Sequence, residues 1–292
     1  MRPGVALTVE STFGLAANSD RGPSADPGFT IDDTSLLATI GADAVRLTFD
    51  WARLQPHPER VDSAWVERYD ELLGAADAAG LEVWACALDH AVPRWFDNEG
   101  GLDDAEALTR RWPRWFEVVV DRWGDRIAGW VPFDVAPAEP RQVWADTRGI
   151  LRGGPAPAAY TVAIDDATDD TPIDTPIETA IERLIGPDRP EADALAIAGP
   201  WTNADRAEHA LRSLADSADV AIARATITDP PADTAGDTAA DTAADLRRVV
   251  DAAAGDGIAL LAWFVDPWRI VGDDGLVGRD GQPTEAARVC FS

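Results

Sequence analysis

Short apolar runs rich in β-branched residues alternate with amphipathic stretches of helical length along the whole chain. Of all its sequence features, this alternation most limits the possible folds. It is typical of a parallel sheet whose strands are joined by crossover helices. We predict eight strands in the 292 residues, which indicates one α/β domain, a closed (β/α)8 or TIM barrel spanning 1–292. The predicted strands are Gly4–Val9, Ala44–Phe49, Glu82–Leu88, Ile127–Phe133, Ala159–Ile164, Ala194–Ala198, Val220–Thr226 and Ile258–Val265.

Apolar periodicity and helix-ending glycines predict the helices between these strands. The stretch Trp65–Ala79 carries apolar residues one helical turn apart and is followed by Gly80. In Ala105–Trp123 an aromatic and aliphatic face must pack against the sheet, so we expect its tryptophans in the core. The other predicted helices are Asp32–Ile40, Ile177–Ile185, Asn203–Ala215 and Ala243–Ala254.

Two regions depart from this regular pattern. Glycine and proline between Pro137 and Pro157 predict a short or irregular connection in place of the fourth helix, within a shortened, irregular region at 137–222. The second region, 230–245, contains the low-complexity acidic sequence Asp233–Asp245. We interpret it as a solvated loop or the lead-in to a helix.

The charge composition excludes two classes of partner. There are 52 acidic residues against 25 basic ones, all of them arginine, and the net charge is −27. Such a surface repels phosphate backbones and anionic lipids, so we expect no nucleic acid partner and no membrane partner. Dense carboxylates without lysine fit the cytoplasm of a salt-accumulating halophile, where salt screens their repulsion. A high-GC codon bias would also remove lysine.

The cysteines and the apolar runs bear on the compartment. Cys86 and Cys290 lie far apart in sequence, and the first is inside an apolar run, so two separate thiols fit better than a disulfide bond. This indicates a reducing compartment. No stretch approaches 18 apolar residues and no apolar signal core is recognised at the start, so we expect a soluble, cytoplasmic protein.

Two motifs in the first half carry a resemblance to a known family. Residues Gly41–Pro56 read GADAVRLTFDWARLQP and contain Arg46. Residues Leu88–Trp95 read LDHAVPRW and are followed by a Gly-Gly pair and Leu102. The first resembles R-F-S-I-x-W-S-R-[IL]-x-P, the second-strand signature of the glycoside hydrolase family 1 β-glycosidases. The second is similar to the family's L-x-H-x-x-L-P-x-W…G-G-W, with one residue deleted and Leu102 in place of the last tryptophan.

At strand four the resemblance offers two registers for the family's acid/base. Residues Gly129–Pro137 resemble W-x-T-F-N-E-P, whose glutamate is the general acid/base. One register places Asp134 on the asparagine and Val135 on the glutamate, which would delete the acid. The other, counted back from Gly149–Gly153, places Glu139 on the glutamate.

The last two strands resemble the family's nucleophile and sugar-binding motifs. Residues Ala225–Pro231 correspond to I-T-E-N-G, whose glutamate is the nucleophile, and Asp229 replaces that glutamate. Residues Leu261–Trp268 are similar to W-S-L-x-D-N-x-E-W, but the sugar-chelating glutamate before the final tryptophan is missing. The resemblance covers about Ser11–Pro140 and Ala223–Ser292, whereas 150–222 is not recognisable. It implies the barrel fold.

The resemblance also implies roles for individual residues. Glycosidic cleavage uses one carboxyl group as acid and a second as nucleophile or base, which here are Glu139 and Asp229 respectively. Arg46 is expected to bond the strand-seven carboxylate and keep it ionised, or else to pair with a loop carboxylate. The implied substrate-binding residues are Arg46, His90, Asp134, Trp263 and Trp268. Core packing is the alternative for His90 and for both tryptophans.

The sequence therefore predicts a divergent β-glycosidase-like hydrolase acting on O-glycosidic bonds of a small carbohydrate or glycoside. Because aspartate is one methylene shorter than glutamate, the gap at Asp229 would widen and would favour inversion or no reaction. The alternative is a barrel that has lost catalysis and keeps a sugar-binding or regulatory role, which Val135 and the turn after Asp229 favour. We find no P-loop, dinucleotide fingerprint or His/Cys cluster, so we expect no cofactor and no metal.

Overall fold

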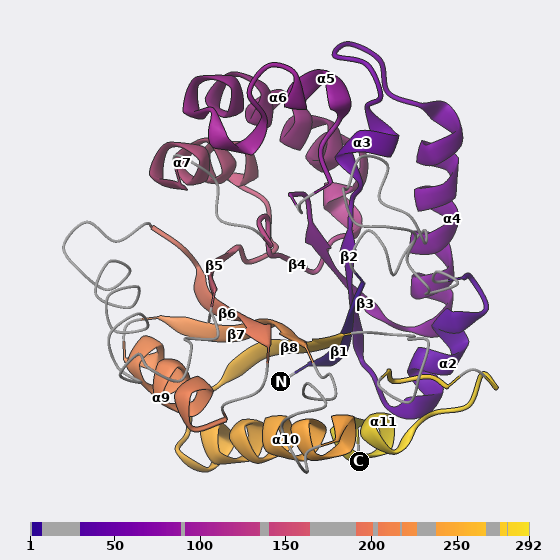
Figure 1. Cartoon of the computed structure of the whole chain (residues 1–292), viewed down its shortest axis with the longest axis vertical. Helices are drawn as coiled ribbons and strands as arrows, with labels where there is room; N and C mark the ends of the chain where they lie inside the picture. The colour runs from indigo at the N-terminus through magenta and orange to yellow at the C-terminus, as the bar shows by residue number, and fades with distance from the viewer. Residues whose placement is uncertain are drawn as a thin grey trace.

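Eight parallel strands form a nearly closed barrel, as predicted (Figure 1). The computed structural model describes residues 2–7, 30–88, 91–134, 140–163, 191–200, 204–216, 218–226, 238–266, 275–278 and 280–291. Neighbouring strands follow the order β4-β3-β2-β1-β8-β7-β6-β5. The strands are β1 (Pro3–Leu7), β2 (Ala44–Thr48), β3 (Glu82–Cys86), β4 (Gly129–Trp130), β5 (Ala159–Ala163), β6 (Ala194–Pro200), β7 (Asp219–Thr226) and β8 (Leu260–Asp266).

The gap between the two edge strands, β4 and β5, is narrowed at the shortest strand. Trp130 of β4 forms a parallel bridge with Ala158, and its backbone N–H donates to the Pro157 carbonyl at 2.8 Å. Beyond β4 the chain continues beside the end of β3. The Asp134 N–H donates to the Leu88 carbonyl there, at 2.8 Å. This hydrogen bond fixes where Asp134 leaves the barrel wall.

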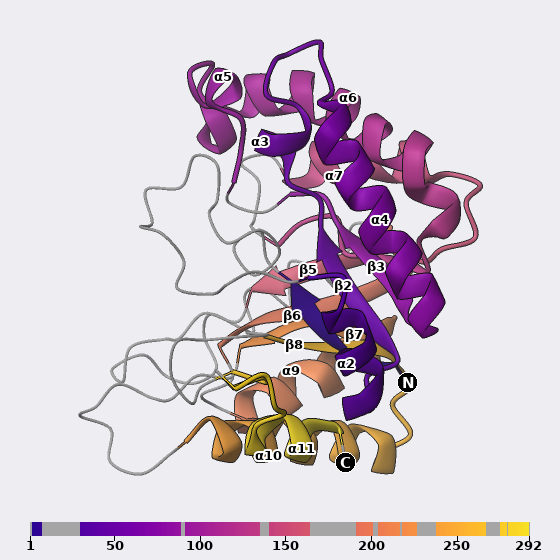
Figure 2. The same cartoon turned by 90° about the vertical axis from the view of Figure 1, so that its right-hand side faces the viewer.

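Among the described residues, helices lie around the barrel between most successive strands (Figures 1 and 2). The helix α4 begins after Asp62, whose side chain accepts from the Ala64 N–H at 3.0 Å, and it ends at Gly80 with φ 74°. The described helices are α2 (Asp33–Ile40), α3 (Trp51–Leu54), α4 (Ser63–Ala79), α5 (Arg94–Asp97), α6 (Ala105–Trp123), α7 (Pro140–Leu151), α9 (Ala204–Ala215), α10 (Ala239–Gly255) and α11 (Glu285–Phe291). The predicted helix Ile177–Ile185 lies outside the described residues.

The prediction of an irregular connection between Pro137 and Pro157 was wrong for most of that segment. The twelve residues Pro140–Leu151 form α7, which buries Trp144 and Thr147. Proline stands at the first position of the helix, where its missing N–H costs nothing, and Gly153 with φ 95° lies just past the end. These residues therefore mark the ends of a helix, although they were interpreted as breaking it.

Of the two interpretations of 230–245, a solvated loop or the lead-in to a helix, the second holds for the described part, where the helix begins earlier than predicted. Residues Ala239–Gly255 form α10, whose first turn is fixed by a capping box between Thr238 and Asp241. The repeated Asp-Thr-Ala sequence thus supplies both a helix cap and helix-forming alanines. Residues 230–237 lie outside the described part of the chain.

The barrel has two apolar layers, one outside the sheet and one inside it. The outer layer, between sheet and helices, contains the buried Trp112, Trp115 and Trp123 of α6, which confirms their predicted core position. The inner layer holds Trp84 and Phe264, with ring centroids 5.6 Å apart, and otherwise mostly small side chains. Its alanines are Ala6, Ala44, Ala159, Ala194, Ala196, Ala198, Ala221, Ala223 and Ala262. Two large rings among many methyl groups therefore fill the lumen.

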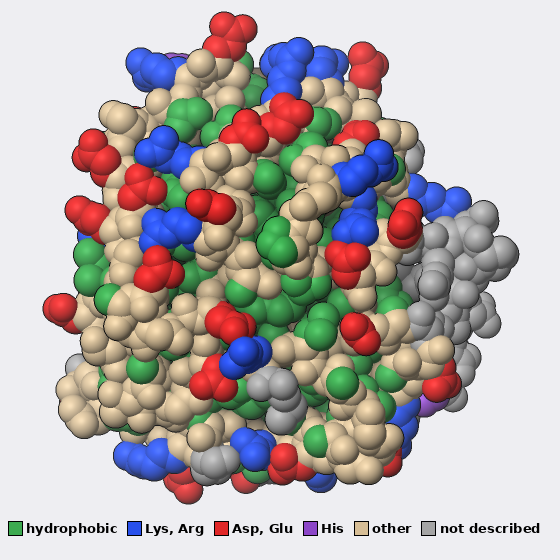
Figure 3. Space-filling model, turned by 180° about the vertical axis from the view of Figure 1, so that it is seen from behind, with side chains coloured by type: hydrophobic (Ala, Val, Ile, Leu, Met, Phe, Trp, Pro, Cys, Tyr) green, Lys and Arg blue, Asp and Glu red, His purple; other side chains and the backbone are tan. Residues whose placement is uncertain are grey.

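Several surface arginines are paired with carboxylates from distant parts of the chain. Arg2 pairs with Glu82 at 2.7 Å, and Arg212 pairs with Asp256 at 2.7 Å. Figure 3 shows acidic and arginine side chains interspersed over the face opposite to the one seen in Figure 1. Within the described ranges, no helix is both long and apolar enough to cross a lipid bilayer. Cys86 and Cys290 are buried and free, as two separate thiols were predicted to be.

We predict that Gly129→Ala destabilises the protein by about 1–3 kcal/mol, since overpacking a filled core has a cost of this size. A Cβ at this position would lie 2.5 Å from the Trp84 ring, which fills the lumen and has no room to withdraw. Chemical denaturation measures the free energy of unfolding. Gly149→Ala in α7 is the matched control, because no atom lies within 4 Å of its added Cβ. That control should not lose stability, and an equal loss in both variants would contradict the proposed packing.

Candidate active site

Four charged side chains from four different strands meet at the carboxyl ends of the barrel strands. Arg46 of β2 donates from Nη1 to Oδ1 of Asp134, which follows β4, at 2.7 Å. Arg224 of β7 places Nε 3.3 Å from Oδ2 of the same carboxylate and Nη1 3.7 Å from Oδ2 of Asp266, the last residue of β8. Enzymes with this fold have their active sites at this end of the barrel. We refer to these four residues as the mouth network.

Three of the four side chains in the mouth network are buried. Side-chain exposure is 0% for Arg46, 3% for Asp134 and 7% for Asp266, but 26% for Arg224. Arg224 is therefore the member that solvent reaches. Burial is the largest single influence and would lower the pKa of Arg46, but the attraction and hydrogen bond of Asp134, together with Cys86 and Asp266, outweigh it. The pKa is therefore raised above its usual range and Arg46 stays charged.

Asp266 has the opposite balance. Burial raises the pKa of its carboxyl group, and the negative charge of Asp134 acts in the same direction. Arg224 and the Thr226 hydroxyl lower the pKa in part. The network therefore combines a permanent cation with a carboxyl group that binds a proton more readily than an ordinary aspartate.

Several polar atoms of this region have no hydrogen-bond partner among the described residues. They are Nε and Nη2 of Arg46, Oγ1 of Thr48 and Oδ1 of Asp266. Buried polar groups without partners lower stability, so such a concentration at one end of a barrel is unusual for a purely structural core. Within the described ranges no group of His, Cys, Asp and Glu has the arrangement of a metal site.

The structure describes three of the residues that the sequence nominated for the site. Arg46 and Asp134 lie together at the mouth, where Arg46 pairs with the carboxylate that follows β4. The strand-seven carboxylate expected as its partner, Asp229, lies outside the described residues. Trp263 does not face the mouth. It is 1% exposed in the outer layer, with its ring stacked on Phe291 of α11 at 5.7 Å, and so belongs to the core, which was the alternative interpretation. The other nominated residues, His90, Glu139, Asp229 and Trp268, lie outside the described residues.

Sequence reasoning gave no functional role to the other two members of the network. Asp266 ends an apolar strand, which is the position where the active sites of barrel enzymes lie. Arg224 lies inside the apolar strand DVAIARAT, and a charged residue in such a run was the available signal. The face of the sheet to which the Arg224 side chain points could not be predicted from the sequence, because it depends on a local irregularity of β7.

The aromatic residues of the two family-like motifs have a structural role. Trp51, which begins α3, stacks on Trp115 of α6 with centroids 5.6 Å apart, and meets Trp95 edge-on at 6.0 Å. Gln55 joins the two, because its side-chain oxygen accepts from Trp51 Nε1 and its backbone carbonyl accepts from Trp95 Nε1, each at 2.9 Å. The segments after β2 and β3 are thereby held against α6.

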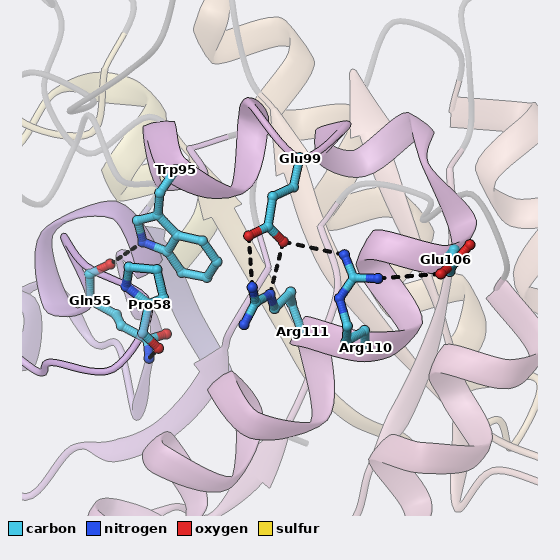
Figure 4. A network of polar contacts seen from close by, with 7 residues as sticks. All are labelled: Gln55, Pro58, Trp95, Glu99, Glu106, Arg110 and Arg111. Atoms are coloured by element: carbon cyan, nitrogen blue, oxygen red, sulfur yellow. Dashed lines mark hydrogen bonds and ion pairs between the residues drawn. The ribbon is translucent and has the colours of Figure 1, made fainter.

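An ion-pair network continues this brace along α6 (Figure 4). Arg111 lies over the Trp95 ring at 5.3 Å and bonds both oxygens of Glu99, at 2.7 and 2.9 Å. Arg110 lies between Glu99, at 3.3 Å, and Glu106, at 3.5 Å. The motif residues Trp51 and Trp95 thus hold the barrel rim in place. A sequence match at these two residues therefore indicates a shared fold rather than a shared reaction.

This geometry defines a (β/α)8 barrel with a charged site at the carboxyl end of its strands, the class of scaffold that many enzymes share. Residues 29–145 match the model of the family described as Glycosyl hydrolase family 1. That part of the chain therefore carries a divergent, partial resemblance to glycosyl hydrolase family 1.

Individual proteins show the same resemblance. The chain is similar to beta-glucosidase 34 of Oryza sativa subsp. japonica, with 26% identity over 106 residues, which is 35% of this chain and 20% of that relative. The match thus spans a fifth of the relative's length. Among solved structures, beta-glycosidase BGL167 has a TM-score of 0.75 at 15% identity, covering 99% of this chain and 94% of that one. The beta-glycosidase from Pyrococcus horikoshii has a TM-score of 0.68 at 13% identity, covering 89% and 82%. At these identities the structural matches establish the fold.

We predict that Asp266→Asn changes the pH dependence of stability. Because the folded pKa of Asp266 is raised, its carboxyl group contributes stability fully below the ordinary value of 3.8 and loses it as the pH rises through the folded pKa. The melting temperature of the variant relative to the wild type should therefore increase as the pH rises above 3.8. Thermal melts from pH 3 to 8 measure this difference. A difference that stays constant or falls with rising pH would contradict the role of burial.

Proposed function

We propose that this protein is a divergent β-glycosidase-like hydrolase that cleaves the O-glycosidic bond of a small carbohydrate or glycoside at its barrel mouth. The observation that carries the proposal is the contact between Asp134 and Arg224, which joins the ends of β4 and β7. The two catalytic candidates follow these ends in the chain, Glu139 five residues after Asp134 and Asp229 three residues after Thr226. The family match over 29–145 supports the same reaction class.

Glycosidic cleavage needs a proton for the departing oxygen and a carboxylate for the anomeric carbon. In the proposed mechanism Glu139 protonates the leaving group. Asp229 attacks the anomeric carbon or activates a water molecule for that attack. Asp134 bonds sugar hydroxyls, and Arg46 holds Asp134 through the 2.7 Å hydrogen bond. Neither a metal nor a cofactor takes part, and His90 and Trp268 are further candidates for contact with the sugar.

The spacing of the two carboxyl groups decides between the two stereochemical outcomes. Retention requires about 5–5.5 Å and inversion about 6.5–9.5 Å. Because Asp229 is one methylene shorter than a glutamate, the proposal favours the wider spacing and hence inversion. Proton NMR of the first sugar released from an aryl β-glycoside distinguishes the two anomers.

We predict that Asp229→Ala and Glu139→Ala each lower the kcat for aryl β-glycosides by roughly 10²–10⁴-fold, the usual contribution of a general acid or base. The assay is release of the aryl alcohol in buffer with molar KCl. The Glu139 variant should lose least with leaving groups of low pKa, since these need little protonation.

The matched control is Glu106→Gln, whose side chain is 91% exposed on α6 and which should turn over like the wild type. Unchanged turnover in both alanine variants would discard the assigned pair. Measurable sugar binding by a wild type without turnover would identify a sugar-binding barrel that has lost catalysis.

We further propose that the protein works in the cytoplasm of a salt-accumulating organism. Its net charge of −27 comes from 52 acidic residues, of which the 25 arginines can neutralise fewer than half. Exposed ion pairs such as Arg212–Asp256 contribute little individually. Repulsion among the remaining carboxylates therefore dominates the surface electrostatics, and salt screens it.

We predict that the melting temperature rises as KCl is increased from about 0.01 M to 1 M, because the screening length falls from about 30 Å to 3 Å over this range. Differential scanning calorimetry measures the change. Sucrose of equal osmolality serves as the control, since it lacks the screening charge. A melting temperature that is unchanged or higher after desalting would refute salt dependence.

A further inference from the structure

Strand β7 contains a β-bulge at Arg224. The pairing register shifts there against both neighbouring strands, β6 and β8. On the β6 side, Ile222 pairs with Ile197 and Arg224 pairs with Ala198, so one extra residue of β7 has no partner. On the β8 side, Ile222 pairs with Trp263 and Ala225 with Val265, so three steps along β7 correspond to two along β8. Both registers place the extra residue immediately before or at Arg224.

The bulge changes the direction of the Arg224 side chain. In a regular strand, successive side chains alternate between the two faces. Ile222 and Ala225 lie in the outer apolar layer, and Ala221 and Ala223 lie in the inner one. Alternation after Ala223 would send Arg224 into the hydrophobic layer between sheet and helices. The bulge turns it inward, where it contacts Asp134 and Asp266.

Bulges of this kind are frequent next to active sites, where they re-aim a side chain. Here the re-aimed group is a planar guanidinium that contacts carboxylates from β4 and β8 together, at 3.3 and 3.7 Å. With 26% of its side chain exposed, Arg224 is also the member of the mouth network that solutes can reach. A cation placed only for stability could pair on the outer surface, as Arg212 does with Asp256.

We infer that Arg224 is a positioning residue of the barrel mouth, turned inward by the bulge in β7 to hold Asp134 and Asp266 in the arrangement that the bound glycoside requires. This inference rests on the proposed glycosidase function and deepens it. Arg224 fixes the strand-four carboxylate from the side opposite to Arg46, so that Asp134 cannot rotate when substrate binds. Lysine could not replace it fully, because one ammonium group lacks the planar geometry that contacts two carboxyl groups together.

The test compares Arg224→Ala, Arg224→Lys and the control Arg248→Ala in the aryl β-glycoside assay. Arg248 lies on α10, pairs with the exposed Asp205 and is itself 49% exposed. For Arg224→Ala we expect kcat/KM to fall on the order of 10²-fold, the loss typical of a misplaced catalytic geometry. Arg224→Lys should retain part of the activity, and Arg248→Ala should retain all of it.

Chemical rescue separates positioning from a purely structural role. Guanidinium chloride at concentrations far below denaturing ones should restore part of the kcat/KM of Arg224→Ala, with equal KCl as the reference. It should not restore activity that is lost through unfolding. If Arg224→Ala does not fold, the Lys variant carries the test. For that variant, activity lost only in proportion to its folded fraction would overturn the inference.

The outcomes also separate this inference from the proposed function. An active wild type whose Arg224→Ala variant keeps its kcat/KM, or is not rescued, overturns the positioning role and leaves the function intact. A wild type that cleaves no aryl glycoside refutes the function. Calorimetric binding of an aryl β-glucoside then decides the inference. Weaker binding by Arg224→Ala supports it, and equal binding or none by the wild type overturns it.

Discussion

The shared carboxylate of Asp134 is the interaction on which the architecture of the mouth depends. It lies between two guanidinium groups, one from β2 and one from β7, and is almost wholly buried. Burying charged groups is expensive, and replacing buried ion pairs by apolar residues often leaves a protein equally stable or more so. Stability therefore gives little reason to retain this network in an apolar barrel. A requirement for charge at the carboxyl end of the strands explains it better.

The interior of the barrel below the mouth network is suited to hold charged side chains at the carboxyl ends of the strands. Below the mouth the lumen is filled by two aromatic rings and a ring of alanines, so the small side chains allow Trp84 and Phe264 to close the interior. A charged layer can then lie directly on an apolar floor, which lowers the local dielectric constant and strengthens every interaction above it. Arg46, on the strand beside Trp84, is the lowest charged member and remains charged because Asp134 and other nearby groups together compensate for its burial.

Most of the fold could be predicted from the sequence, whereas half of the described mouth network could not. Strand positions follow from apolar runs, and seven of the eight strands agree closely with the predicted ranges, with β4 shortened to two residues. The helix α7 was missed because its glycines and proline were counted without regard to position. For Trp263 the choice between sugar binding and core packing stayed open, because the alternation of β8, which sends it outward, cannot be fixed without knowing the register. Arg224 was missed because a bulge depends on two neighbouring strands, and neither is visible in the local sequence.

The residues that match the family and the residues of the mouth network have different structural roles. The matched range 29–145 contains β2, β3, β4 and the helices that brace them, where Trp51, Gln55 and Trp95 form a set of contacts in which each side chain restrains the others. Packing of this kind resists substitution because a change at one residue disturbs the others. The mouth is built differently, from single side chains at strand ends that alter chemistry without altering packing. A chain can therefore keep the recognisable brace of a glycosidase barrel while its charged residues are rearranged. In this chain the mouth includes an arginine from β7 that contacts two carboxylates, and the proposed reaction depends on that arrangement.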